Sequence, residues 1–163
     1  MATPVVYTAT YSHSAEALRA ALSDEQYWKD RVDEVGGVLV AFDAADDRVR
    51  VRMTQTVAAA ELPGVVTAVR PEGLVVTRTE IYARDGGSFD ARVEGVPARV
   101  SGTVRLTESG TAAVAIVDGA AEVGIPLFGR RIEGAVVARL RDVLAAEAEF
   151  TDTWITGHRR VDR

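Results

Sequence analysis

The chain has 163 residues, enough for one domain with its own core, and its 47% hydrophobic and 26% charged residues are typical of a globular protein. A formal net charge of −5 and a pI near 5.1 argue against nucleic-acid binding, which needs a basic surface. Without cysteine there is no disulfide, thiolate metal site or thiol nucleophile, and no apolar run approaches the ~20 residues of a membrane-spanning helix. We therefore expect a single cytoplasmic domain over residues 1–163 with no integral membrane association.

The first part of the chain predicts a strand followed by two short helices. Residues 4–11 are rich in Val, Tyr and Thr, which favours a strand. Residues 15–22 and 25–34 carry good helix formers, and each segment follows serine or aspartate residues that can cap a helix N-terminus. Gly36 and Gly37 end this bent helical arm.

From residue 38 to residue 123 the hydrophobic period changes to two, which predicts an antiparallel sheet with one solvated face. The predicted strands are 38–42, 48–57, 74–83, 88–94, 98–107 and 111–123. Most of the connections are short and rich in glycine, so neighbouring strands should pair as hairpins. The longer connection 58–73 has room for one helical turn. With the first strand, this makes a seven-stranded sheet.

One long helix is predicted from Ile125 to about Thr156, with Pro126 in its first turn. Its apolar residues fall on one face and are Phe128, Ile132, Val136, Leu140, Val143, Leu144, Phe150 and Trp154. About 30 residues rising 1.5 Å each give a rod of roughly 45 Å, which must cross a whole sheet to bury this face. The charged tail 157–163 is expected to fray.

The sheet face opposite this helix is predicted to be lined mainly by small side chains. Its members are Phe89, Ala91, Val93, Val100, Gly102, Val104 and Leu106, followed on the last strand by either Ala113, Ala115, Val117 and Gly119 or the opposite face of that strand. A helix lying on a curved sheet lined by Ala, Gly and Val leaves space between the two layers, which predicts a cavity. The alternative is that neighbouring Leu, Ile and Phe side chains fill the gap, and the sequence leaves both possibilities open.

Glu147 falls inside the apolar face of the long helix, where an unpaired carboxylate costs several kcal/mol. It either pairs with an Arg or Tyr of the sheet or reaches solvent, or it is a polar anchor in the cavity wall, with a raised pKa if unpaired. Gln55 and either Tyr7 or Tyr11 are further polar residues that could point inward. The strand 74–83 presents to the interior either Arg78, Glu80 and Tyr82 or Thr77 and Thr79.

The order of strand, two short helices, six antiparallel strands and long helix resembles the helix-grip fold of the START-related superfamily (SRPBCC). That superfamily includes polyketide cyclases, aromatases and lipid-transfer domains. The segment 123–133 (VGIPLFGRRIE) and the Tyr27-Trp28 pair resemble an actinobacterial branch of it that has no assigned function. The resemblance implies an α+β fold with a pocket and supplies no catalytic residues. We expect Gly129 to mark close packing and Glu133 to tie the start of the helix to the sheet.

Three functions are compatible with these features. The leading one is non-catalytic binding or transport of a hydrophobic small molecule such as a lipid, isoprenoid or polyketide-like compound. Its predicted ligand-binding residues are Trp28, Met53, Gln55, Tyr82, Phe89, Phe128, Ile132, Val136, Leu140, Val143 and Glu147. The alternatives are a cyclase or aromatase-type enzyme with Glu147 as general acid or base, and a protein-interaction module that could form a homodimer.

We expect neither a metal nor a cofactor. His13 and His158 lack a further ligand at metal-binding spacing, and no phosphate-binding loop, dinucleotide fingerprint or nucleophile-elbow motif is present.

Overall fold

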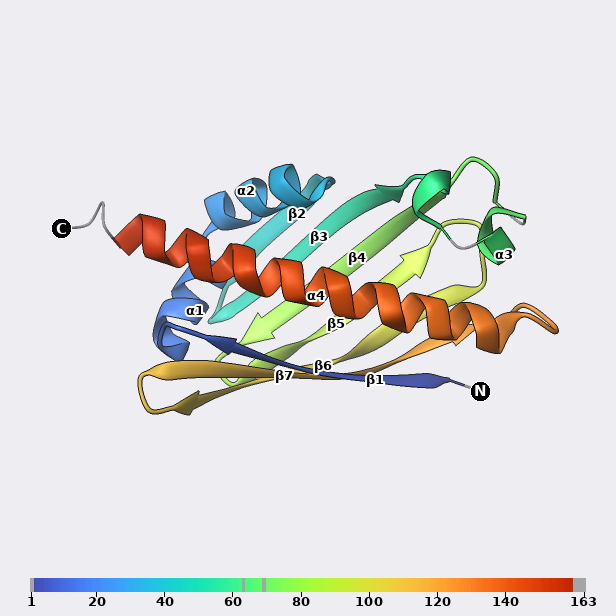
Figure 1. The fold of residues 1–163 in the computed structure, drawn as a ribbon. Helices are drawn as coiled ribbons and strands as arrows, with labels where there is room; N and C mark the ends of the chain where they lie inside the picture. The colour runs from blue at the N-terminus through green and yellow to red at the C-terminus, as the bar shows by residue number, and fades with distance from the viewer. Residues whose placement is uncertain (1, 63, 69, 160–163) are drawn as a thin grey trace.

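The computed structural model describes residues 2–62, 64–68 and 70–159, which form a curved antiparallel sheet crossed on one face by a long helix (Figure 1). The strands are β1 (Thr3–Tyr11), β2 (Val38–Ala45), β3 (Arg48–Val57), β4 (Leu74–Ala83), β5 (Gly86–Val93), β6 (Ala98–Ser109) and β7 (Ala112–Val123). The helices are α1 (Ala15–Leu22), α2 (Glu25–Val35), the short 3-10 helix η1 (Ala59–Glu61), α3 (Gly64–Thr67) and α4 (Gly129–Arg159). The predicted α+β fold, with seven strands, two short helices after the first strand and a long C-terminal helix, is confirmed.

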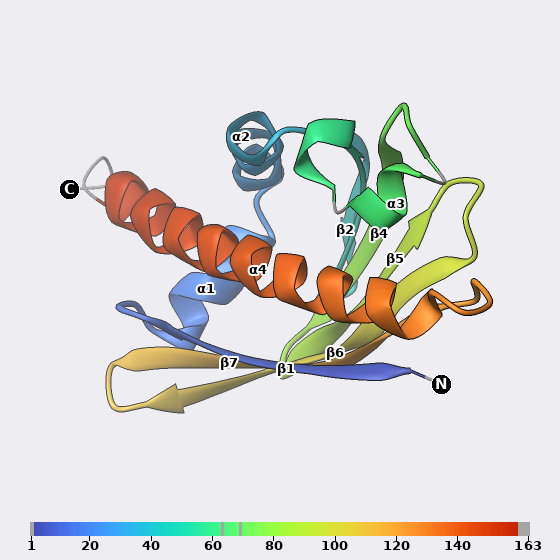
Figure 2. The same ribbon diagram turned by 45° about the vertical axis from the view of Figure 1, so that its right-hand side comes forward.

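The strand order is β1-β7-β6-β5-β4-β3-β2, and every neighbouring pair is antiparallel. Strands β2 to β7 follow one another as hairpins, whereas β1 pairs with β7 at the opposite edge from β2. The chain between β1 and β2 must therefore cross from one edge of the sheet to the other. Helices α1 and α2 make this crossing at one end of the molecule, and α3 lies near the other end (Figures 1 and 2).

Two hairpin turns are tighter than predicted, which lengthens the strands around them. Asp46 and Asp47 form a two-residue turn with φ of 53° and 61°, so β2 continues to Ala45 rather than ending at Phe42. Left-handed φ at both central positions is the geometry that matches the twist of a hairpin, and aspartate tolerates it better than most residues. β5 likewise begins at Gly86, directly after the turn residues 84 and 85.

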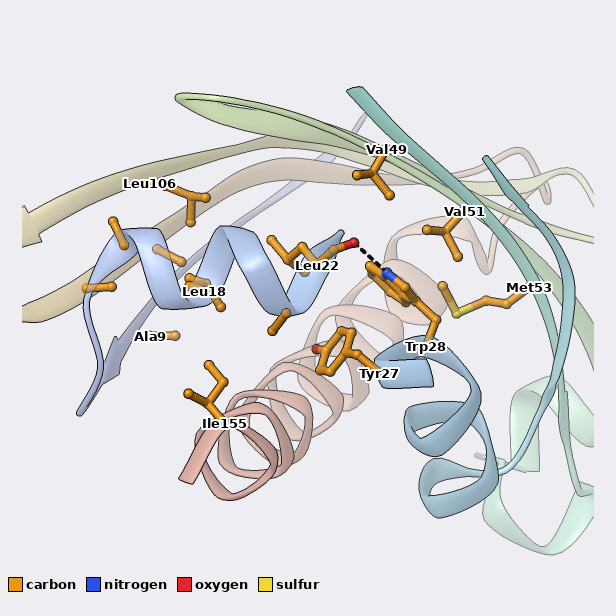
Figure 3. Packing of buried hydrophobic residues seen from close by; sticks show 14 of the residues in the cluster. Ala9, Leu18, Leu22, Tyr27, Trp28, Val49, Val51, Met53, Leu106 and Ile155 are labelled. Atoms are coloured by element: carbon orange, nitrogen blue, oxygen red, sulfur yellow. Dashed lines mark hydrogen bonds between the residues drawn. The ribbon is translucent and has the colours of Figure 1, made fainter. Parts of the chain in front are cut away.

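The arm of α1 and α2 packs into the main hydrophobic core (Figure 3). Ser14 caps α1 by accepting a hydrogen bond from Ala17 N at 3.1 Å, and Asp24 caps α2 by accepting one from Gln26 N at 2.9 Å. Trp28 is fully buried, and its Nε1 donates to the Leu22 carbonyl at 2.8 Å, which fixes the bend between the two helices.

Helix α4 begins at Gly129, so the prediction that it starts at Ile125 with Pro126 in its first turn is wrong. The chain makes a separate turn over 126–128, with Leu127 at φ 70°. A Cβ at Gly129 would lie 2.6 Å from the Val123 carbonyl oxygen, which confirms close packing there. Glu133 accepts hydrogen bonds from Val123 N at 2.9 Å and Thr3 Oγ1 at 2.8 Å, so it ties the first turns of α4 to β7 and β1 as predicted.

The C-terminal end of α4 differs from the prediction of a frayed tail over 157–163. Residues 157–159 continue the helix to Arg159, while 160–163 lie outside the described residues. His158 stacks on Trp154 with ring centroids 3.6 Å apart, and its Nδ1 lies 2.9 Å from the Trp154 carbonyl oxygen. These contacts extend the helix by one turn beyond Thr156.

Candidate ligand-binding cavity

A cavity of about 830 Å³ lies between α4 and the sheet. Its walls are formed by inward residues of β1 and β3 to β7, by α4 and by parts of α1, α2, η1 and α3. The apolar lining includes Val76, Phe89, Val100 and Val104 from the sheet and Ile132, Val136, Leu140 and Val143 from α4. The small side chains of the sheet face therefore leave space that the helix does not fill, which decides between the two possibilities that the sequence left open.

A second, smaller hydrophobic cluster lies near the start of α4 and contributes to the cavity wall. Val66, Val123 and Ile132 are its buried members, and Leu62 and Val136 pack against them. An exposed ion pair lies further along α4, where Arg139 Nη2 approaches Glu61 Oε1 of η1 at 3.7 Å. The connection between β3 and β4 thus forms part of the cavity wall.

Strand β4 turns Arg78, Glu80 and Tyr82 toward the cavity. Its register with β3 pairs Arg78 with Met53 and Glu80 with Val51, and both partners belong to the buried face of β3. Only 8% of Arg78 and 2% of Glu80 is exposed. The face that carries Thr77 and Thr79 is therefore the outer one.

Four charged side chains, Arg31, Arg78, Glu80 and Glu147, form a buried cluster in the cavity wall. Glu147 receives two hydrogen bonds from Arg78, from Nη1 to Oε1 at 2.6 Å and from Nη2 to Oε2 at 3.0 Å. Arg31 Nη2 forms a close ion pair with Glu147 Oε2. Glu80 Oε2 lies 3.2 Å from Arg78 Nε and 3.6 Å from Arg31 Nη2. Two positive and two negative groups make the cluster neutral as a whole.

The cluster holds Glu147 in its ionised form. Burial raises the pKa of this carboxyl, but the adjacent Arg31 and Arg78 guanidiniums outweigh that effect and lower the pKa from 4.5 to about 2. Of the alternatives that the sequence left open, pairing with an arginine of the sheet is the one observed, and the raised pKa expected for an unpaired carboxylate does not arise because Glu147 is paired on both oxygens. Glu147 therefore belongs to the cavity wall as a charged, fully engaged group.

Two tyrosines support this cluster through their hydroxyl groups. Tyr82 donates to Glu80 Oε1 at 2.5 Å. Thr151 Oγ1 donates to the Glu147 carbonyl oxygen at 2.7 Å, and the Tyr27 hydroxyl lies 2.6 Å from the same Oγ1. Because the Thr151 proton is already used, Tyr27 is the donor in that contact. The α2, β4 and α4 elements are thereby joined around one polar centre.

Comparison with known proteins places this chain in a family. The model of a family described as proteins of unknown function (DUF2505) matches residues 6–155, nearly the whole chain. The chain belongs to the DUF2505 family. An uncharacterised protein of Mycobacterium tuberculosis strain H37Rv is 28% identical to this DUF2505 protein over 167 residues, covering 93% of this chain and 95% of its own length.

Solved structures show the same fold at low sequence identity. The protein TTHA0849 from Thermus thermophilus has a TM-score of 0.65 at 13% identity, with 96% of this chain and 99% of that chain covered. A START superfamily protein from Mycobacterium smegmatis has a TM-score of 0.55 at 15% identity, with 94% and 97% covered. The di-domain ARO/CYC protein StfQ of the steffimycin biosynthetic pathway has a TM-score of 0.56 at 14% identity, with 98% of this chain and 52% of that chain covered. The DUF2505 protein thus has a START-like fold, as its element order indicated.

Most of the predicted ligand-binding residues of the DUF2505 protein lie in the cavity wall. These are Gln55, Tyr82, Phe89, Ile132, Val136, Leu140, Val143 and Glu147. Three others lie elsewhere. Trp28 and Met53 are buried in the core beneath the helical arm (Figure 3), because α1 and α2 cover that end of the sheet. Phe128 is 48% exposed, because α4 begins only after it.

Arg31 belongs to the charged cluster of the cavity wall but is not among the ligand-binding residues predicted from the sequence. It follows Tyr27 and Trp28 by four and three positions, so it shares their buried helix face. An arginine on the buried face of a helix is the feature of the sequence that indicates a functional residue here. Among residues 2–62, 64–68 and 70–159 there is no cluster of acidic, histidine or cysteine residues that could hold a metal ion, and no helix long and apolar enough to cross a membrane.

Proposed function

We propose that this DUF2505 protein binds and carries a hydrophobic small molecule in the cavity between α4 and the sheet, without catalysing a reaction. The observation that carries the proposal is the cavity of about 830 Å³ with its largely apolar lining. Ligand sites in proteins commonly measure about 300–1,000 Å³ and combine apolar walls with a few placed polar groups. Lipid, isoprenoid and polyketide-like molecules have the size and polarity that such a space accepts.

Proteins with this fold supply further support. The structures similar to this chain include a START superfamily protein and an ARO/CYC protein of a biosynthetic pathway. Both names are compatible with a small organic molecule as ligand. At 15% and 14% identity they share the fold with this chain, and the proposed ligand class rests on the cavity itself.

The state of Glu147 favours binding over acid-base catalysis. A general acid or base must exchange a proton near the working pH. Glu147, with a pKa lowered to about 2 and both oxygens bound by arginines, is unsuited to that role in a cyclase or aromatase reaction.

A protein-interaction role would instead use exposed apolar groups such as Val38 and Val40 on the edge strand β2, and light scattering on the purified protein would reveal a homodimer.

Native mass spectrometry of freshly purified protein tests the proposal, because a retained ligand appears as a defined mass increase. Val100→Trp and Thr103→Trp form a matched pair on β6, since Val100 lines the cavity and Thr103 is exposed on the other face. We expect Val100→Trp to abolish ligand retention and the thermal stabilisation by added apolar ligands, and Thr103→Trp to preserve both. Equal binding by the two variants, or no binding by the unmodified protein, would contradict a ligand in this cavity.

A further inference from the structure

Within the described residues the cavity wall contains five arginines, and each of them already forms an ion pair. Arg31 and Arg78 pair with Glu147 and Glu80 inside the cavity. The other pairs lie nearer the surface and are Arg70 with Glu72, Arg99 with Asp90, and Arg139 with Glu61. Arg31 Nε makes no hydrogen bond within the described residues, but it belongs to a guanidinium that is already paired with Glu80 and Glu147. A carboxylate or phosphate entering the cavity would therefore compete with existing ion pairs, or lose its hydration with little compensation.

Two hydroxyl groups in the same wall are in the opposite situation. Tyr7 and Tyr11 are inward residues of β1, with only Ala9 between them on that face, and both line the cavity. Neither hydroxyl makes a hydrogen bond to any residue in the described ranges 2–62, 64–68 and 70–159, whereas the Tyr27 and Tyr82 hydroxyls are bonded to Thr151 and Glu80. The cavity thus offers two unused hydroxyl donors.

The Tyr11 hydroxyl remains protonated at physiological pH. Burial raises the pKa of Tyr11 above its usual value of 10, and the neighbouring Tyr27 raises it further. A neutral phenol donates its proton to an acceptor oxygen. At 3.3 Å per residue, Tyr7 and Tyr11 are about 13 Å apart along β1, so the two donors serve different positions along an extended molecule.

We propose that the cavity selects an uncharged, mainly apolar molecule with acceptor oxygens, such as an ester, ketone or alcohol, and that Tyr7 and Tyr11 donate hydrogen bonds to those oxygens. This inference rests on the proposed function and specifies its ligand class. Anionic amphiphiles such as free fatty acids are disfavoured, because each arginine in the described part of the wall already forms an ion pair with a carboxylate. The inference also assigns a ligand-recognition role to two residues on β1.

A displacement assay with the neutral apolar dye N-phenyl-1-naphthylamine tests the proposed binding function and the proposed ligand class separately. The competitors are methyl laurate and laurate, which share one hydrocarbon chain and differ in the charge of the head group. We expect methyl laurate to displace the dye at a concentration about tenfold lower than laurate. The double variant Tyr7→Phe with Tyr11→Phe should lower the affinity for methyl laurate about three- to tenfold, which corresponds to the loss of one hydrogen bond. Its affinity for the dye should not change.

The double variant Thr8→Val with Thr10→Val is the matched control, because it removes two hydroxyls from the exposed face of the same strand, away from the cavity wall, and should leave the preference for the ester unchanged. If the dye binds but laurate competes as well as methyl laurate, or the double phenylalanine variant keeps full ester affinity, the selection for neutral acceptors is refuted and the binding function stands. If neither the dye nor either competitor binds, the proposed binding function fails and the ligand class fails with it.

Discussion

Removing one acid from the buried cluster should destabilise the protein far more than removing a matched pair of charges. Arg31, Arg78, Glu80 and Glu147 are each less than one-tenth exposed, and their charges cancel. Glu147→Leu leaves two guanidiniums against one carboxylate, and an uncompensated buried charge of this kind costs about 3–5 kcal/mol. That is a large part of the roughly 5–15 kcal/mol by which a typical domain is stable.

Urea unfolding at neutral pH measures this effect directly. With a slope of about 2 kcal/mol per molar urea, the midpoint of Glu147→Leu should fall by roughly 1.5–2.5 M. The double variant Arg78→Met with Glu147→Leu retains the facing pair Arg31 and Glu80 and is neutral again, so it should recover at least about 2 kcal/mol relative to the single variant. A double variant no more stable than Glu147→Leu, or a single variant that loses less than about 1 kcal/mol, would refute this account of the cluster.

Three further predictions concern the same structure. Because the pKa of Glu147 is lowered from 4.5 to about 2, the stabilisation that its ionised form provides is complete above about pH 5 and is lost as the pH falls toward 2. Glu147→Gln should therefore reduce the acid-dependent loss of unfolding free energy by about 3 kcal/mol. Gly129→Ala, which would meet the Val123 carbonyl, should cost about 1–3 kcal/mol in a thermal or urea melt, whereas Gly134→Ala, with open space around it, should stabilise α4 by up to about 1 kcal/mol. Tyr27→Phe should lose about 0.5–1.5 kcal/mol with its hydrogen bond, and Tyr7→Phe should be close to neutral in the ligand-free protein; equal losses would contradict the assignment of their hydroxyls.

The sequence determined the elements of this protein and the directions of most of their side chains. Alternation along β3, β5 and β6 identified the inward faces, because the buried and solvated faces of a strand differ strongly in the polarity of their side chains. The helical period marked the face of α4 that covers the sheet, and Glu147 stood out as a carboxylate within it. Gly129 and Glu133 also stand out in the sequence, and in the structure both lie against Val123.

Only the tertiary structure decided which groups meet. Both faces of β4 mix apolar and polar residues, so the alternation along this strand does not distinguish its inner face from its outer one. The register against β3 places Arg78 on the inner face. Arg31, Arg78 and Glu147 come from α2, β4 and α4, and the distances between them depend on how these three elements pack rather than on spacing along the chain. The cavity has the same origin, because whether small side chains leave a void depends on how far the helix stands from the curved sheet.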